Sequence, residues 1–334
     1  MGYIRVIYAL EVCRLERVSP MKLDVICFGA LNLDRLYRVD RIAKGGEERF
    51  VMDFEECPGG SAANTAAGLA RLGLKVGYIG KVAKDREGLL LLEDFKREGV
   101  DLRGIIVSKE GRSGTVMGYV DQKGERALYV DPGVNDTIGF EEIDLEYASS
   151  AEFLHFTSFV GEKPLEAQRR LVEALRGDVK LSLDPGDLYA RKGLTVLKPL
   201  IRRSFVALPN EREMRLLTGR DYEDGARILM REGVQIVAVK LGGRGCYVTD
   251  GGESHLIEPF RVEVVDTTGA GDAFCTGFLY GLIKKKDLYE CGRLGNFVAS
   301  RCIQRIGARE GLPRIKDFCL LYTSPSPRDR QKTR

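Results

Sequence analysis

One string of the sequence combines a carboxylate with a turn that can hold an anion: VVDTTGAGDAFCTGFLYGL at residues 264–282. A strand is expected to lead into a turn formed by Gly269, Ala270 and Gly271, and a helix to begin near Asp272. The glycines allow a tight turn whose N–H groups, with the helix N-terminus, suit the charge of a phosphoryl group in transfer. Asp272 is placed to accept a proton from an attacking hydroxyl, although an Asp here can also be a helix N-cap.

A second glycine-rich string lies near the start of the chain, CPGGSAANTAAGLARLG at residues 57–73. Its paired Gly59 and Gly60 permit close approach of the backbone to a ligand. Asn64, in the first turns of the following helix, offers both a donor and an acceptor for hydroxyl groups. The same residues would also suit a plain helix start with Asn64 as a cap. Taken alone, this string leaves both interpretations open.

The elements that could position these strings alternate from residue 23 to about residue 316. Helical patterns at 62–73 and 86–99 end at Gly73 and Gly99, both candidates for C-caps. They separate apolar runs that predict buried strands. The strand candidates include LDVICFGA, KVGYIGKV, EFLHFTSF, VKLSLDP, FVALP and QIVAVKLG. Strands alternating with helices predict an α/β fold whose parallel sheet is covered by helices on both faces.

Two segments depart from this alternation, at about residues 31–57 and 105–130. Both have the period of strands with polar turns, and DQKGER is a typical hairpin turn. The two segments could pair into one small sheet that forms a lid over a site on the main sheet. Arg112, Tyr119 and Arg126 would then lie in the lid, either touching a substrate or simply covering a β surface.

Composition narrows the class of protein. The chain has 334 residues, of which 44% are hydrophobic and 30% charged, and the net charge is +3. This near balance of basic and acidic residues argues against nucleic acid or an anionic membrane as the main partner. The eight cysteines form no C-x-x-C pair and there are only two histidines, which argues against zinc or redox sites. No apolar stretch reaches the length of a membrane span, and we expect a cytoplasmic protein with reduced thiols.

The two ends differ from the rest of the chain. Residues 1–20 carry charges that interrupt their short apolar part, and the run beginning at Met21 is expected to be the natural start. Residues 319–334 are rich in Pro, Ser and Arg and lack apolar periodicity. We expect both ends to be disordered or not native to the protein, which leaves 21–318 as the folded domain.

The two glycine-rich strings, in this order, resemble the two signatures of the ribokinase (PfkB) carbohydrate kinase family. The resemblance extends over about residues 23–316. It implies a ribokinase-like three-layer α/β/α sandwich with a mainly parallel central sheet and a small β lid. It also implies ATP-dependent phosphorylation of a hydroxyl on a sugar or sugar-like molecule. Asp272 would be the general base, and the turn from Gly269 to Asp272 the anion hole.

The resemblance also implies an acceptor pocket. An Asp shortly after the first strand binds substrate hydroxyls in this family, and GALNLD places Asn32 and Asp34 there. Gly59, Gly60 and Asn64 would line the same pocket. One position departs from the family pattern, because Ser158 stands where ribokinase proper carries a Glu that helps to bind ribose. This departure argues against ribose itself, and His155 on the same strand is expected to be a buried structural residue.

The nucleotide side follows from further family motifs. The N-x-x-E motif would place Asn210 near the phosphates, with Glu213 organising Mg²⁺ and its waters. VKLGGRGCYV resembles the nucleotide loop, in which Gly242 and Gly245 would admit the phosphates and ribose of ATP.

Three further positions of the nucleotide side are open to more than one interpretation. Lys240 stands where ribokinases often carry Thr, and it could either reach a phosphate or be solvated. Asn296 falls where the family packs residues against adenine. Asp266 and the Thr268 carbonyl match a monovalent-cation site, so that K⁺ is a candidate cofactor. The family's lids often pair through their sheet edges, and a homodimer is therefore expected.

Several other functions compete with the sugar kinase. A nucleoside kinase of the same family, for adenosine, inosine or cytidine, would be favoured by an aromatic lid. A 2-keto-3-deoxygluconate kinase and a fructokinase are further options, and a phosphofructokinase could use Arg112, Lys123 or Arg126 for the existing phosphate. A non-catalytic homologue is disfavoured because Asp272 and Glu213 are both present. The sequence has neither the glycine fingerprint of a Rossmann dehydrogenase nor a Walker A string.

Overall fold

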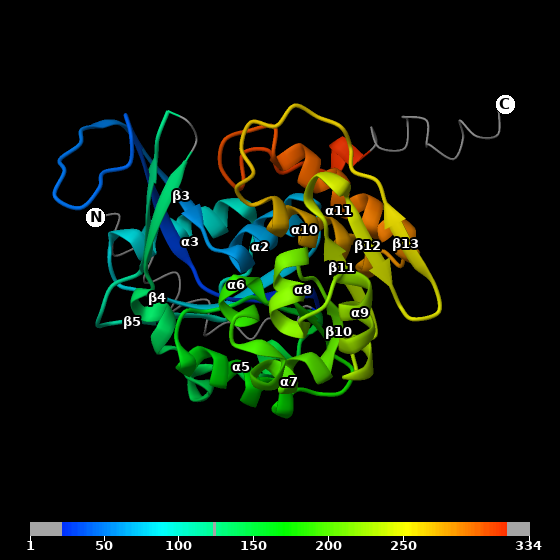
Figure 1. Cartoon of the computed structure of the whole chain (residues 1–334). Coiled ribbons are helices and arrows are strands. Elements are labelled where there is room, and N and C mark those ends of the chain that lie inside the picture. The colour runs from blue at the N-terminus through cyan, green and yellow to red at the C-terminus, as the bar shows by residue number, and fades with distance from the viewer. Residues whose placement is uncertain (1–21, 123–124, 319–334) are drawn as a thin grey trace.

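The computed structural model of the chain describes residues 22–122 and 125–318 and is shown in Figure 1. The expectations for residues 1–20 and 319–334, and the phosphate contact considered for Lys123, lie outside these described residues.

A large central sheet organises the described residues. Nine of their strands follow the order β13-β12-β11-β10-β9-β8-β1-β4-β5, parallel from β11 to β5, with β12 and β13 added antiparallel at one edge. β4 is buried at every position, because helices cover both faces of the sheet. The strands are β1 Leu23–Phe28, β4 Val76–Ala83, β5 Ile105–Ser108, β8 Ala151–Phe156, β9 Lys180–Leu183, β10 Ser204–Ala207, β11 Ile236–Lys240, β12 Cys246–Thr249 and β13 Ser254–Ile257.

Helices pack on both faces of this sheet, and each face has its own apolar core. One face carries α2 Ser61–Arg71, α3 Arg86–Glu98, α10 Ala270–Ile283 and α11 Leu288–Cys302. The other carries α5 Glu162–Ala174, α7 Gly193–Arg203, α8 Glu211–Thr218 and α9 Tyr222–Arg231, with the short α4 Leu145–Ala148 and α6 Gly186–Ala190 in connections. Figure 1 shows the two groups above and below the sheet, which confirms the three-layer arrangement expected from the sequence.

A second sheet of four strands projects from one end of the sandwich (Figure 1). Its order is β3-β2-β6-β7, and the parallel pair β2–β6 joins the two segments that are distant in sequence. The strands are β2 Asn32–Val39, β3 Val51–Gly59, β6 Gly114–Val120 and β7 Arg126–Asp131. Residues 105–108, which the sequence interpretation placed in this lid, instead form β5 and pair with β4 of the central sheet. The second lid segment therefore begins at Gly114.

The carboxyl ends of three neighbouring parallel strands bring polar residues to one edge of the central sheet. Asp184 follows β9, Asn210 follows β10, and Lys240 is the last residue of β11. In open α/β sheets this edge is where ligands bind.

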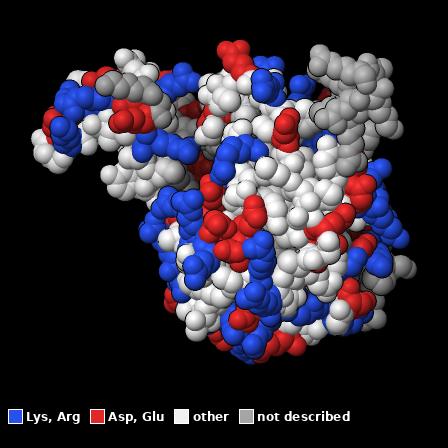
Figure 2. Space-filling model, turned by 45° about the vertical axis from the view of Figure 1, so that its right-hand side comes forward, with Lys and Arg blue, Asp and Glu red and all other residues white. Residues whose placement is uncertain are grey.

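The surface shows no large region of one charge sign in the view of Figure 2, where Lys and Arg are interspersed with Asp and Glu. Within the described ranges, the structure contains no helix with both the length and the apolar character that a bilayer crossing requires.

Candidate active site

The glycine-rich turn opens α10, as the sequence predicted. The N-cap is Gly269, whose φ of +74° lies in the left-handed region that favours glycine. A Cβ at this position would also lie 2.5 Å from the Cβ of Ala308. Asp272 is the third residue of the helix, so its interpretation as the N-cap is wrong. The turn from Gly269 to Asp272 thus forms the N-terminus of a 14-residue helix, where free N–H groups and the helix dipole favour an anion.

The carboxylate of Asp272 is half-buried and held by a neighbouring helix. Asn64 Nδ2 donates a hydrogen bond of 2.8 Å to Asp272 Oδ2. Burial raises the pKa of Asp272 to about 6, and this rise is opposed by the Asn64 bond and the charge of Lys240. A carboxylate with this pKa is ionised at neutral pH, yet basic enough to take a proton from a reacting hydroxyl.

Asp34 on β2 is a second carboxylate with an unusual environment. Its Oδ1 is buried and has no hydrogen-bond partner among the described residues. Burial raises the pKa of Asp34 to about 7, although the positive charge of Arg309 opposes the rise. A buried oxygen without a donor is suited to accept a hydrogen bond from a ligand hydroxyl.

The paired glycines are sterically required where they stand. A Cβ on Gly59 would lie 2.2 Å from Asp34 Oδ2, so a side chain here would displace the carboxylate. Gly60 has a φ of +101°, and a Cβ there would lie 2.2 Å from the Ala30 carbonyl oxygen. Both glycines therefore let the backbone pass close to the residues around Asp34.

The two predicted asparagines of the acceptor side are tied to protein groups. Asn32 Oδ1 accepts a hydrogen bond of 3.0 Å from Nδ2 of the buried Asn135, a residue not identified from the sequence. Asn64 donates to Asp272 and accepts at 2.8 Å from Arg309 Nε. It does not cap α2, whose N-cap is Gly60, so the capping interpretation of Asn64 is wrong.

Asn210 and Glu213 form a reciprocal capping box at the start of α8. Asn210 Oδ1 accepts from the Glu213 amide at 2.8 Å, and Glu213 accepts from Asn210 through both of its carboxylate oxygens. Burial raises the pKa of Glu213, and the nearby carboxylate of Asp184 adds to the rise. Such a carboxylate would be stabilised by a cation. No cluster of three metal-ligating side chains occurs in residues 22–122 and 125–318, so Mg²⁺ here would depend on waters and substrate phosphates.

Lys240 is largely buried, with 11% of its side chain exposed, and it is paired, so the solvated interpretation of this residue is wrong. Its Nζ lies 2.8 Å from Asp184 Oδ2, and the thiol of Cys275 donates to the same oxygen at 3.3 Å. Burial alone would lower the pKa of Lys240, but the Asp184 carboxylate outweighs it and the pKa is raised. A Cβ on Gly271 would lie 3.6 Å from the ammonium, which places a fixed positive charge beside the glycine-rich turn.

The nucleotide-loop residues have clear local roles. Gly242 and Gly245 both have positive φ, and a Cβ on Gly245 would lie 1.9 Å from the Ile257 carbonyl oxygen. Asn296 on α11 donates to the carbonyls of Ile257 and Glu258 at 3.0 and 3.1 Å. Its amide nitrogen therefore holds the end of β13, and its contact with adenine stays a prediction.

The Asp266 carboxylate organises the chain before α10. It accepts from the Thr268 amide and hydroxyl at 2.9 and 2.7 Å and from the Gly307 amide at 2.9 Å. Burial raises the pKa of Asp266, but these donors outweigh burial and the net shift is downward. Arg126 of the lid donates from Nη1 to Thr268 Oγ1 at 2.9 Å. The lid therefore reaches the glycine-rich turn through a charged side chain.

The other singled-out residues lie apart from these contacts. Arg112 is paired with Asp131 of the lid, and the ring of Tyr119 stacks with that of Tyr37 at 5.2 Å. His155 is fully buried, with Nδ1 3.0 Å from Ser182 Oγ. Burial lowers the pKa of His155 to about 4, as expected for a structural, neutral histidine. The Oγ of Ser158 would lie 2.7 Å from a Cβ on Gly186.

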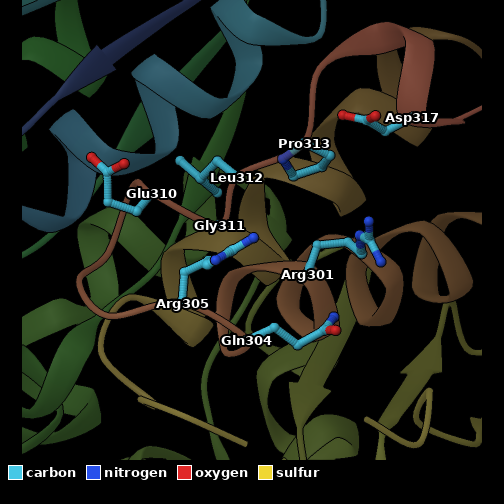
Figure 3. A pocket seen from close by; sticks show the side chains of 8 residues that line it. All are labelled: Arg301, Gln304, Arg305, Glu310, Gly311, Leu312, Pro313 and Asp317. Carbon is cyan, nitrogen blue, oxygen red and sulfur yellow. The ribbon is translucent and has the colours of Figure 1, made fainter. Parts of the chain in front are cut away.

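A hollow near the C-terminal end is separate from this site. Figure 3 shows its lining side chains from α11 and the following segment. None of the predicted site residues contributes to it. The lining residues are Arg301, Gln304, Arg305, Glu310, Gly311, Leu312, Pro313 and Asp317.

Asp184, Cys275, Asn135 and Arg309 were not identified from the sequence. Asp184 carried a usable signal, because it directly follows the strand run VKLSL at the carboxyl end of a parallel strand. Arg309 lies in an irregular segment 37 residues after Asp272, and no local pattern marks it.

Comparison with known proteins gives a consistent result. Residues 22–315 match the pfkB family carbohydrate kinase group. The chain is 49% identical over 253 residues to an uncharacterized sugar kinase of Archaeoglobus fulgidus, covering 75% of this chain and 100% of that protein. It is 33% identical over 292 residues to an ATP-dependent ribose-1-phosphate kinase of Halopiger xanaduensis, covering 85% of this chain and 93% of the relative.

The fold agrees with these matches. The crystal structure of a ribokinase from Thermotoga maritima superposes with a TM-score of 0.82 at 26% identity, covering 90% of this chain and 100% of that one. This confirms the ribokinase-like fold expected from the sequence.

Proposed function

Because this chain belongs to the pfkB family of carbohydrate kinases, we propose that it phosphorylates a sugar hydroxyl from ATP with Asp272 as the general base. The observation that carries the proposal is the position of this carboxylate at the N-terminus of α10, beside the anion-binding turn. The acceptor hydroxyl gives its proton to Asp272 while its oxygen forms a bond to the γ-phosphorus. The bond from that phosphorus to the bridging β–γ oxygen breaks, and ADP leaves.

The turn and Lys240 would stabilise the transferred group. N–H groups at the helix N-terminus point toward the developing charge, and the ammonium of Lys240 lies beside the same turn. Because Asp184 fixes the ammonium, little reorganisation is needed during the reaction. This arrangement supports positioning and electrostatic stabilisation as the main contributions to catalysis.

The nucleotide and metal complete this proposal. ATP would lie between the turn and the loop that contains Gly242 and Gly245. Glu213 and Asn210 would hold Mg²⁺ through water, and the ion, when bound, would neutralise charge on the β- and γ-phosphates. Asp266 and the Thr268 carbonyl would hold K⁺, since both lie next to the turn and offer oxygen ligands.

The acceptor is proposed to be a polyhydroxylated sugar or sugar phosphate that donates a hydroxyl to Asp34. The unpartnered oxygen of Asp34 supports this assignment. The similarity to a ribose-1-phosphate kinase favours including phosphorylated pentoses among the candidates. Ser158, in place of the ribokinase Glu, argues against free ribose as the preferred acceptor.

A coupled ADP-release screen tests this function with ribose, ribose 1-phosphate, fructose, 2-keto-3-deoxygluconate, adenosine, inosine and cytidine. We expect acceptor-dependent ADP release with one of the sugars or sugar phosphates. Release with a nucleoside alone would replace the sugar assignment by the nucleoside kinase. No acceptor-dependent release with any of these compounds would argue for the non-catalytic homologue.

We also propose a cytoplasmic homodimer that pairs through the lid. The lid exposes several large apolar side chains, which would be covered by a second copy. These residues are Phe50, Val51, Met52, Phe54, Leu128, Tyr129 and Val130. Free cysteines at all six described positions suit a reducing compartment. Light scattering should give a dimer for the native chain and a monomer after Met52→Asp; a monomeric native chain would contradict this assembly.

A further inference from the structure

Arg309 is a buried cation that the function proposed above does not use. It lies in the segment after α11 and is 6% exposed. Its Nε donates to Asn64 Oδ1 at 2.8 Å, and its Nη1 pairs with the buried Asp94 of α3. The main chain is held as well, since Arg71 Nη1 donates to the Arg309 carbonyl oxygen at 2.5 Å. Arg309 is therefore held both at its guanidinium and at its main chain.

The contact with Asn64 decides which way an amide faces. A carboxamide has an oxygen that accepts and a nitrogen that donates, whereas a guanidinium only donates. Arg309 therefore requires the oxygen of Asn64 on its own side. The amide nitrogen is then directed to Asp272, where it donates to Oδ2 at 2.8 Å. In the opposite orientation the amide oxygen would face the carboxylate and repel it.

We propose that Arg309 is a positioning residue for phosphoryl transfer, which fixes the Asn64 amide so that it donates to and orients the carboxylate of Asp272. The inference depends on the proposed role of Asp272 as the base. Arg309 acts on Asp272 through Asn64 and does not itself touch the reacting atoms, and its charge separately opposes the rise in the pKa of Asp34.

An arginine suits this role better than a lysine. Its planar head sends Nε to one partner and Nη1 to another in fixed directions, whereas an ammonium is a single point charge. Asp94 balances the buried charge, and the Arg309 Cζ lies 5.8 Å from the centre of the Phe95 ring. With its charge balanced by Asp94, the guanidinium can donate hydrogen bonds in fixed directions.

The effect should be visible in the pH dependence of kcat. A hydrogen bond to a carboxylate stabilises its ionised form, so loss of the Asn64 bond should raise the kinetic pKa of the base. kcat reports the enzyme–substrate complex, in which the acceptor already occupies Asp34. The other charged or titratable groups that act on Asp272 are Asp34 of β2, Tyr78 of β4, Asp184 after β9, Lys240 of β11, and Cys275 and Cys302 on α10 and α11.

The test compares Arg309→Met in an Asp94→Asn background with Asp94→Asn alone. The background avoids leaving the buried Asp94 carboxylate with only the exposed Arg97 to balance its charge. We expect Asp94→Asn to keep kcat within about threefold of the native value. The acidic limb of its profile of kcat against pH should lie at the same pH as in the native enzyme. The double variant should lower kcat about tenfold or more and move the limb upward by about 1 pH unit, with the KM for ATP little changed.

A double-mutant cycle separates positioning from packing. Asn64→Ala should produce the same shift of the limb, and adding the Arg309 change to it should produce no further shift. If the double variant does not fold, Arg309→Gln with Asp94→Asn replaces it, because Gln keeps a polar chain and can still donate one hydrogen bond. That variant should shift the limb less than Asn64→Ala does.

An acidic limb that stays at the position of Asp94→Asn would overturn the inference and leave Arg309 a packing residue. Independent shifts from Asn64→Ala and Arg309→Met that add together would also overturn it. Neither outcome touches the base assignment, which is tested separately and is lost if Asp272→Asn keeps normal turnover.

Discussion

The two halves of the site differ in how their charges are paired. On the proposed phosphate side, Lys240 is paired with Asp184, and Glu213 is engaged by Asn210 through both oxygens. On the proposed acceptor side, Asp34 keeps a buried oxygen without a partner among the described residues, and the lid presents apolar side chains to the outside. Charges that are already paired suit phosphoryl transfer, a step common to many kinases. A buried oxygen without a donor can instead accept a hydrogen bond from a particular substrate.

The largest effect should come from the base on the phosphate side. Asp272→Asn keeps the shape of the side chain but removes its ability to take a proton. We expect kcat to fall by about 10³-fold or more while ATP still binds, as measured by turnover and by calorimetry. Turnover close to that of the native enzyme would contradict the mechanism, and loss of ATP affinity would point to a structural defect instead.

A somewhat smaller effect should follow from removing the cation beside the turn. Lys240→Met in an Asp184→Asn background avoids leaving the Asp184 carboxylate without its paired cation and should lower kcat about 10²-fold. Lys240→Arg, which keeps the charge, is the matched control and should retain more activity. If the variant with Lys240→Met and Asp184→Asn has the same kcat as Lys240→Arg, the charge of Lys240 does not act on the transferred group.

In both halves of the site, local elements were more predictable from the sequence than tertiary contacts. The turn at Gly269 and the lid strands are encoded locally, by glycines and alternating apolar residues, and the structure has them where they were expected. Element boundaries were predicted less accurately, since α10 begins at Ala270, two residues before the predicted start. β5 was wrongly assigned to the lid, although it pairs with β4 of the central sheet, because a four-residue strand carries too little periodicity to show which sheet it joins.

Tertiary contacts could not be found in this way. Arg309 reaches Asn64 across 245 positions of the sequence, and Lys240 reaches Asp184 across 56. Partners of this kind depend on which strand ends and helices lie side by side. Their side chains also have common surface alternatives, so composition alone does not distinguish a buried pair from a solvated one.

On the acceptor side, Gly59→Ala should weaken acceptor binding without affecting ATP. The added Cβ would lie 2.2 Å from Asp34 Oδ2 and must displace it. We expect the KM for the acceptor to rise about 10-fold, with the KM for ATP unchanged. Gly45→Ala in the same lid is the matched control, because nothing lies within 4 Å of its added Cβ. A similar small change in both variants would remove Asp34 from the acceptor site.

The smallest effect concerns stability. The pKa of Asp34 is raised to about 7 by burial, from an ordinary value of 3.8. The folded protein therefore binds a proton more tightly than the unfolded chain, and this group makes the fold less stable as the pH rises through that range. Asp34→Asn should thus gain stability relative to the native chain between pH 5 and pH 8, by about 2 kcal/mol in the free energy of unfolding. Urea unfolding of both proteins at pH 5 and pH 8 measures this gain. If the free energies of unfolding of the variant and the native chain differ by the same amount at both pH values, burial of Asp34 has no energetic cost.

The most direct test of the central claim is a crystal structure with a non-hydrolysable ATP analogue and the acceptor identified by the ADP-release screen. We expect the γ-phosphate at the turn from Gly269 to Gly271 and the acceptor hydroxyl about 3 Å from the Asp272 carboxylate. An acceptor whose reacting hydroxyl faces away from Asp272, with the γ-phosphate elsewhere, would contradict the claim.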